Sequence, residues 1–176
     1  MGLDSIKKLR KLTSLGVNDC REALNKSQGN FEQALKILKS RGIDMLSKKS
    51  SRATCQGLID SYVHFGGNLG VIVEVNCETD FVARTDVFKK FVKDIAMQVA
   101  AAAPEYIKKD CIPEEVLSGV KNPEEYVKKY CLLEQSFIKN SKLSVQDYLH
   151  DVVSQTGENI AIKRFVRFSL GEDNEI

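Results

Sequence analysis

Residues 56–76, which read QGLIDSYVHFGGNLGVIVEVN, carry the clearest structural signal in the chain. Two apolar-rich segments, residues 57–65 and 69–75, flank the turn GGN at 66–68. The glycines of this turn can take the positive φ angles that a tight hairpin needs. The second segment is largely apolar on both faces, which is typical of a central strand. The sequence therefore predicts an antiparallel hairpin whose second strand lies at the centre of a small sheet, with one face of that sheet well covered.

After the hairpin the pattern becomes helical. Between residues 88 and 99, phenylalanine and aliphatic residues recur at helical spacing, and Pro104 closes this amphipathic helix. Two shorter helices are predicted to begin at Pro113 and Pro123. Each proline is followed by two glutamates, which the helix dipole favours in the first turn. We expect these helices to cover the sheet.

The last part of the chain adds one more helix and one more strand. Ser144 and Asp147 have the spacing of a capping signature, so a helix is predicted to begin there and to end at Gly157. Residues 160–170 are predicted to form a strand. Strict alternation places on one side of that strand Ile162, Arg164, Val166, Phe168 and Leu170. The order of helices, hairpin, helices and closing strand predicts the α+β class, with an antiparallel sheet covered by helices.

Residues 4–41 are predicted to form three short helices ahead of the hairpin. Asn18 and Asn30 are favourable N-cap residues for the second and third helices, and Gly29 and Gly42 supply helix stops. Three helices of about ten residues each make only a marginal core. We therefore expect a compact module that packs against a partner or against the rest of the chain.

The net charge also differs between the N-terminal part and the rest of the chain. Residues 1–54 hold 12 basic and five acidic side chains, a net charge of +7, whereas residues 55–176 hold 14 basic and 19 acidic ones, a net charge of −5. The basic part could approach an acidic partner or RNA. We predict a three-helix module at 1–46, a polar and basic linker at 47–54, and an α+β core at 55–176.

The composition is that of a globular protein, with 43% apolar and 28% charged residues. No apolar run approaches the roughly 18 residues that span a bilayer. The start of the chain lacks the basic and apolar regions of a secretory signal. Five scattered cysteines without a CxxC pair favour reduced thiols in a cytosol-like compartment. We expect a cytoplasmic location in a bacterium, or an organelle matrix if a transit peptide has been removed.

Signals for catalysis are weak. The sequence has no P-loop, GxGxxG, HExxH or GxSxG pattern, and its two histidines have no close cysteine pair with which to bind zinc. A nucleophile–base pair would have to join His64 with Cys55 or Cys77, and a solvated strand histidine is the more typical reading. We expect a protein without an active site, a cofactor or a metal.

RNA binding is an alternative from another class. The basic N-terminal helices could form an RNA- or ribosome-binding module. However, aromatic residues are few and do not alternate with the basic ones, as a stacking platform for single strands requires. A solvated helical face accounts for most of the lysines. The main interpretation therefore expects no direct contact with nucleic acid or membrane.

Residues 79–84, TDFVAR, follow directly on the predicted central strand. Thr79 is a suitable N-cap for a short helix with Asp80 in its first turn. A phenylalanine at such a junction more often folds back into the core, which is the reading that composition favours. Phe81 exposed beside a carboxylate would instead be an apolar wedge for a partner protein.

Three blocks of sequence span nearly the whole chain in order. The first comprises LRKLT at 9–13, Gly16, DCREAL at 19–24, GN at 29–30 and AL at 34–35. The second is VEVNCETDFVAR at 73–84. The third comprises LLEQ at 132–135, GEN at 157–159, RFVRF at 164–168 and GE at 171–172. Together they resemble the bacterial-type elongation factor Ts family, of which the second block is the most specific signature.

The resemblance implies a translation elongation factor, specifically a guanine-nucleotide exchange factor. Its partner would be elongation factor Tu, in the GDP-bound and nucleotide-free states. The resemblance also implies a ubiquitin-associated-like N-terminal module. The length is similar to that of short family members, which lack the second core subdomain and the coiled-coil insertion. Such members pair as homodimers, and we expect the core to carry that contact.

The resemblance further implies two contact sites on the GTPase. The residues implied to dislocate Mg²⁺ in the GTPase are Thr79, Asp80, Phe81 and Val82. The residues implied to form an N-terminal anchor are Gly16, Val17, Asn18 and Cys20. Two positions of that anchor depart from the family, since Val17 and Asn18 stand where it often has two methionines. Ser136 also stands where the family commonly has proline.

Overall fold

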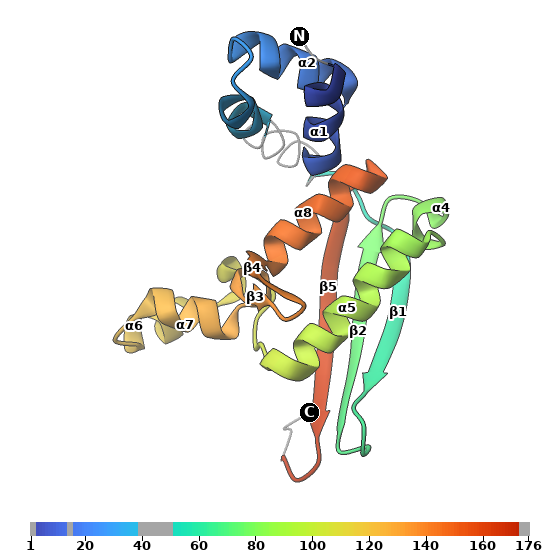
Figure 1. Cartoon of the computed structure of the whole chain (residues 1–176). Helices are drawn as coiled ribbons and strands as arrows, with labels where there is room; N and C mark the ends of the chain where they lie inside the picture. Colours follow the sequence, from blue (N-terminus) through green and yellow to red (C-terminus); the bar gives the residue numbers. More distant parts are fainter. Residues whose placement is uncertain (1–2, 14–15, 39–50, 173–176) are drawn as a thin grey trace.

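The computed structural model describes residues 3–13, 16–38 and 51–172 (Figure 1). The N-terminal part contains α1 (Leu3–Thr13), α2 (Val17–Lys26) and a helical segment at 31–38. The strands of the core are β1 (Gln56–Val63), β2 (Leu69–Cys77), β3 (Ser136–Phe137), β4 (Asn140–Ser144) and β5 (Ile160–Ser169). Its helices are α4 (Asp80–Ala83), α5 (Asp86–Ala102), α6 (Glu114–Gly119), α7 (Pro123–Tyr130) and α8 (Val145–Thr156), with 3-10 turns at Lys109–Cys111 and Leu132–Glu134. The predicted α+β class is confirmed.

The main sheet has three antiparallel strands in the order β1-β2-β5. The predicted hairpin is therefore present, and β2 is the central strand. Gly66 (φ 98°) and Gly67 (φ 72°) adopt positive φ in the turn, which glycine tolerates without steric cost. Helices α5 and α8 lie across one face of the sheet, and none of the described helices covers the other face (Figure 1).

The core lies between α5 and the covered face of the sheet. Phe88, Phe91 and Ile95 of α5 are fully buried in one cluster with Val73 and Val75 of β2. Full burial of each such side chain stabilises the folded protein by roughly 1.5–3 kcal/mol. The amphipathic pattern at 88–99 therefore identified the main contact between helix and sheet.

Several predicted helix boundaries are also confirmed. The Ser144 hydroxyl accepts from the Asp147 N–H at 3.0 Å, and the Asp147 carboxylate accepts from the Ser144 N–H at 3.0 Å, which closes a capping box at the start of α8. Pro123 is the first residue of α7, and Pro113 directly precedes α6. Gly157 ends α8 with φ 79°.

A β-bulge makes one prediction about the last strand wrong. Glu74 of β2 pairs with Arg164, but the next residue, Val75, pairs with Ile162. The extra residue, Lys163, reverses the alternation of side chains along β5. Ile162 is consequently buried in the core instead of sharing a side with the residues that follow it. The open face carries from β5 the side chains of Arg164, Val166 and Phe168.

The N-terminal helices pack around their own small cluster. Its buried residues are Leu9, Cys20, Ala23, Leu24, Ala34 and Leu38. Asn30 caps the third helical segment as predicted, because its Oδ1 accepts from the Gln33 N–H at 3.1 Å. The predicted N-cap of the second helix is wrong, since Gly16 occupies that position and Asn18 lies in the first turn of α2.

Parts of the predicted domain organisation lie outside the described residues. These parts include the helix stop at Gly42 and the first half, residues 47–50, of the linker predicted at 47–54. The boundaries of the module at 1–46 and of the core at 55–176 therefore stay predictions. Within the described ranges, no helix combines the length and the apolar character needed to cross a membrane.

Candidate partner-binding site

Helix α4 is a single turn between the end of β2 and the start of α5 (Figure 1). Thr79 is its N-cap residue, as predicted, and the Thr79 hydroxyl accepts from the Val82 N–H at 3.4 Å. Thr85 caps α5 in the same way, accepting from the Phe88 N–H at 3.3 Å. A helix this short is not stable by itself. Its position therefore depends on the residues that hold its two ends.

Phe81 points away from the protein and is 79% exposed. On the same helix, Ala83 is buried and Val82 packs partly against the core. Residues two positions apart on an α-helix point in nearly opposite directions, about 200° apart. Burial of Ala83 therefore turns Phe81 outward. The reading of Phe81 as a core residue, which composition favoured, is wrong.

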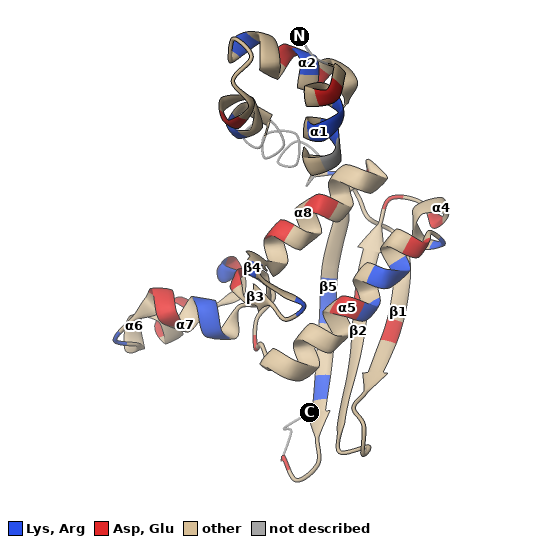
Figure 2. Ribbon diagram, viewed as in Figure 1, with Lys and Arg blue, Asp and Glu red and all other residues tan. Residues whose placement is uncertain are grey.

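Asp80 forms an exposed ion pair next to Phe81. Its carboxylate lies 2.9 Å from the Arg84 guanidinium, four residues further along. The two side chains are 46% and 78% exposed, respectively. Such a surface ion pair contributes roughly 0.5 kcal/mol or less to the stability of the protein. Arg84 can therefore release the Asp80 carboxylate to a partner at little cost, and Figure 2 shows both signs of charge at α4.

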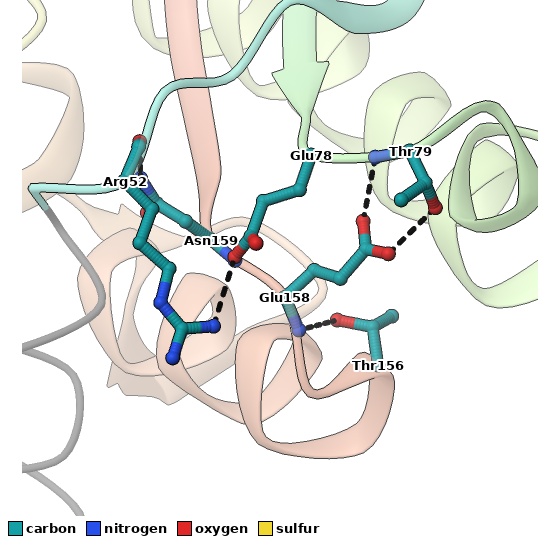
Figure 3. A network of polar contacts seen from close by, with 6 residues as sticks. All are labelled: Arg52, Glu78, Thr79, Thr156, Glu158 and Asn159. Carbon is teal, nitrogen blue, oxygen red and sulfur yellow. Dashed lines mark hydrogen bonds and ion pairs between the residues drawn. The ribbon is translucent and has the colours of Figure 1, made fainter.

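A polar network joins the start of α4 to the turn between α8 and β5 (Figure 3). Glu158 accepts two hydrogen bonds from Thr79, one from the backbone N–H at 3.0 Å and one from the hydroxyl at 2.6 Å. Glu78 accepts from the Asn159 N–H at 2.6 Å, and the Arg52 guanidinium lies 3.5 Å from the Glu78 carboxylate. Asn159 also donates from its side-chain amide to the Arg52 carbonyl at 2.8 Å. The segment at 78–79 and the turn at 158–159 thus each supply a carboxylate that accepts from a backbone N–H of the other.

The sequence did not reveal the roles of these network residues. Glu158 lies 79 positions from Thr79 in the chain. No local pattern signals a contact between positions so far apart, because the pairing of β2 with β5 creates it. The only signal was that GEN at 157–159 belongs to a block that resembles the family.

The predicted N-terminal anchor contains residues of two kinds. Val17 is 49% exposed, and Gly16 and Asn18 are also exposed. Cys20 is fully buried in the helical cluster, so its side chain supports α2 from within and does not face a partner. The surface that this region offers is therefore formed by Gly16, Val17 and Asn18.

The geometry does not support a Cys–His catalytic pair. Cys55 precedes β1 and Cys77 ends β2 at one end of the sheet, whereas His64 follows β1 at the other end. The separation is about 26 Å, the length of eight strand residues. Burial raises the pKa of the Cys77 thiol, and the nearby Glu158 carboxylate raises it further. His64 instead lies 3.1 Å from the Tyr62 hydroxyl through its Nδ1.

No group of His, Cys, Asp and Glu that could hold a metal ion exists within the described part of the chain. What the described residues present is an α+β protein with N-terminal helices. Its candidate site is an exposed aromatic ring on a helix whose N-cap is held by hydrogen bonds, a feature typical of surfaces that bind other proteins.

Comparison with known proteins identifies the family. A family model described as Elongation factor TS matches residues 17–124 and 122–172. The chain is 43% identical to elongation factor Ts of Carboxydothermus hydrogenoformans, over 95% of this chain and 88% of that protein. It is 42% identical to elongation factor Ts of Syntrophus aciditrophicus and 41% identical to that of Thermotoga neapolitana, in both cases over 98% of each chain. The chain therefore belongs to the elongation factor Ts family of translation elongation factors, and these two relatives fit the short form.

Proposed function

We propose that this protein is the guanine-nucleotide exchange factor of elongation factor Tu, and that it releases GDP by inserting Phe81 into the GTPase. The observation that carries the proposal is the outward direction of Phe81 on a helix whose neighbours hold it in place. An exposed ring is free to enter a partner without disturbing its own core. Its burial there would contribute roughly 1.5–3 kcal/mol.

The proposed mechanism acts on the groups that hold GDP. A GTPase binds GDP through backbone N–H groups, a lysine and Mg²⁺, and Mg²⁺ demands near-ideal octahedral geometry. Insertion of Phe81 between helices of elongation factor Tu, with Asp80 beside it, shifts the elements that carry the Mg²⁺ ligands and the phosphates. Thr79 and Val82 set the angle of the ring. By linkage, GDP must weaken binding of this protein by the same factor by which this protein weakens binding of GDP.

The N-terminal helices form the proposed second contact with the same GTPase. Gly16, Val17 and Asn18 supply its surface at the start of α2. Val17 offers a smaller apolar contact than a methionine, and Asn18 offers hydrogen bonds instead. Contact at a second point raises the effective concentration of Phe81 at its target. The anchor would therefore act mainly on affinity.

We also propose a homodimer that forms through the open face of the sheet. Its exposed apolar side chains are Ile59, Val63, Ile72, Val166 and Phe168. A contiguous apolar surface of this kind marks an interaction site, and two sheets can pack face to face. In a two-fold dimer the same patch serves both copies. The Glu74–Arg164 ion pair, at 2.7 Å, lies on this face and satisfies the charges there within each copy.

Release of a fluorescent GDP analogue from purified elongation factor Tu tests the function, with unlabelled GDP in excess to prevent rebinding. We expect this protein to accelerate release by more than roughly tenfold, which corresponds to about 1.4 kcal/mol of barrier. An unchanged release rate contradicts the proposal. Salt-sensitive RNA binding by the full chain, together with an unchanged release rate, would favour the alternative RNA- or ribosome-binding module instead.

A further inference from the structure

We propose that Glu158 is a positioning residue for Phe81: its carboxylate fixes the N-cap of α4 and thereby sets the direction in which the ring leaves the protein. This inference rests on the proposed function, in which Phe81 is the group that acts on the GTPase. It assigns to the turn between α8 and β5 a part in nucleotide exchange without any contact with the partner.

Glu158 holds the N-cap of α4 at two points (Figure 3). Glu158 binds both polar hydrogens of Thr79, on the backbone nitrogen at 3.0 Å and on the hydroxyl at 2.6 Å. Because the hydroxyl hydrogen points to Glu158, the lone pairs of that oxygen are available to the Val82 N–H, 3.4 Å away. One carboxylate therefore anchors the N-cap residue and also orients the cap that begins the helix. Hydrogen bonds to a charged acceptor are roughly twice as strong as neutral ones.

Other contacts of α4 hold it at different points. Ala83 is buried in the core, and the Thr85 N–H donates to the Val82 carbonyl at 3.0 Å. The Cys77 thiol donates to the Thr79 carbonyl at 3.1 Å. Ala83 and Thr85 hold the inner side and the far end of this one-turn helix, whereas the Cys77 thiol is a weak donor and holds its start only weakly. The helix is therefore open to a tilt about Ala83. A carboxylate that grips Thr79 at two points opposes such a tilt, and a tilt would move the Phe81 ring.

Glu158 is itself held in place by its surroundings. The Glu158 N–H donates to the Thr156 hydroxyl at 3.5 Å, and the neighbouring Asn159 N–H donates to Glu78 at 2.6 Å. Directly after this turn, Ile160 is buried in the core of the sheet. Because Glu158 lies just before β5 and binds Thr79, the position of β5 determines where the N-cap of α4 lies.

The test is a double-mutant cycle with Glu158→Ala, Phe81→Ala and the double variant, in the full chain. The readouts are the GDP release rate at saturating concentration of the variant and the concentration that gives half of that rate. We expect Glu158→Ala to lower the saturating rate by roughly tenfold and to change the half-maximal concentration less, because the ring is present but misdirected. With alanine already at position 81, we expect Glu158→Ala to change the rate by less than about twofold. Glu158→Gln keeps an acceptor oxygen for Thr79 and is expected to retain more of the rate.

A matched control and a partner-free measurement complete the experiment. Glu125 is also a carboxylate bonded to an N-cap residue, Asn122 at 3.2 Å, but it serves α7. Glu125→Ala is expected to leave GDP release unchanged. Amide hydrogen exchange of the free protein is expected to quicken at Val82 and Ala83 in Glu158→Ala and not in Glu125→Ala. Thermal unfolding checks that each variant is folded. If Glu158→Ala is not folded, the double-mutant cycle is run with Glu158→Gln in its place.

The outcomes separate the two proposals. Undiminished release by Glu158→Ala, where Phe81→Ala has lost it, overturns the positioning role and leaves the proposed function intact. The positioning role is also overturned if Glu158→Ala lowers the GDP release rate by the same factor in the native protein and in the Phe81→Ala variant. Glu158 would then act independently of Phe81. If Phe81→Ala itself leaves release unchanged, the proposed function is wrong and the positioning role falls with it.

Discussion

The side chains of α4 divide by direction, and this division determines what the protein presents to a partner. Ala83 faces the core, Val82 lies along its edge, and Phe81 faces outward. Leaving Phe81 exposed forgoes roughly 1.5–3 kcal/mol of burial within the protein's own fold. Because folded proteins have only a small margin of stability, the exposed ring on a helix held at its N-cap agrees with the proposed binding role.

Burial also divides the five cysteines, with a testable consequence. Burial raises the thiol pKa of Cys20, Cys77 and Cys131, whereas Cys55 and Cys111 are exposed. A raised pKa lowers the thiolate fraction, so we expect iodoacetamide at about pH 7.5 to modify only the two exposed residues in the native protein. Mass spectrometry of peptides checks this expectation. Modification of Cys77 as fast as Cys55 would contradict the described packing.

The same thiols give a pH dependence whose sign is fixed. Their pKa in the folded protein lies above the unfolded value, so their stabilising contribution is complete below the unfolded pKa of about 8.5. It is lost as the pH rises above that value, because the unfolded chain then releases protons more readily than the folded one. Urea denaturation between about pH 7 and pH 10 is expected to show this decline. Replacing Cys77, Cys20 or Cys131 by alanine removes part of the decline, whatever the effect on packing.

Most helices and strands could be predicted because their signals are local. The hairpin turn at 66–68 and the capping box at Ser144 are set by residues within four positions of one another. The bulge at Lys163 could not be predicted, since it exists only in the pairing of β5 with a strand about 90 positions earlier. The hydrogen bonds from Thr79 to Glu158 also form only because β2 pairs with β5. The direction of Phe81 depends on the phase of a one-turn helix, in which a shift of one residue turns each side chain by about 100°.

Gly57 provides a test of the close pairing between β1 and β2. It has φ 154°, and a Cβ atom there would lie 2.2 Å from the Val75 carbonyl oxygen. We expect Gly57→Ala to lower the free energy of unfolding by more than about 2 kcal/mol, because neither backbone can yield without breaking the ladder. Gly119→Ala is the control, since nothing lies within 4 Å of its added Cβ, and its effect is expected to be about 0.5 kcal/mol or less. Equal stability of the two variants would show that β1 does not approach β2 so closely.

For the molecule as a whole, the unequal faces of the sheet predict its assembly. Ile72 lies near the middle of the open face and is 45% exposed. We expect the native protein to sediment as a dimer and Ile72→Glu to sediment as a monomer, because a carboxylate would be buried at the two-fold contact without a partner. Leu12→Glu changes an exposed apolar residue of α1 and is expected to leave the dimer intact. A native protein that is monomeric at micromolar concentration, or a dimeric Ile72→Glu variant, would contradict this assembly.

The proposed action of Phe81 on the GTPase is tested by comparing two quantities in the Phe81→Ala variant. Because the ring is exposed, we expect the free energy of unfolding to stay within about 0.5 kcal/mol of the native value. We expect the stimulated release of GDP from elongation factor Tu to fall by roughly tenfold or more at saturating concentration. A folded Phe81→Ala protein that stimulates GDP release as fast as the native protein would contradict the mechanism.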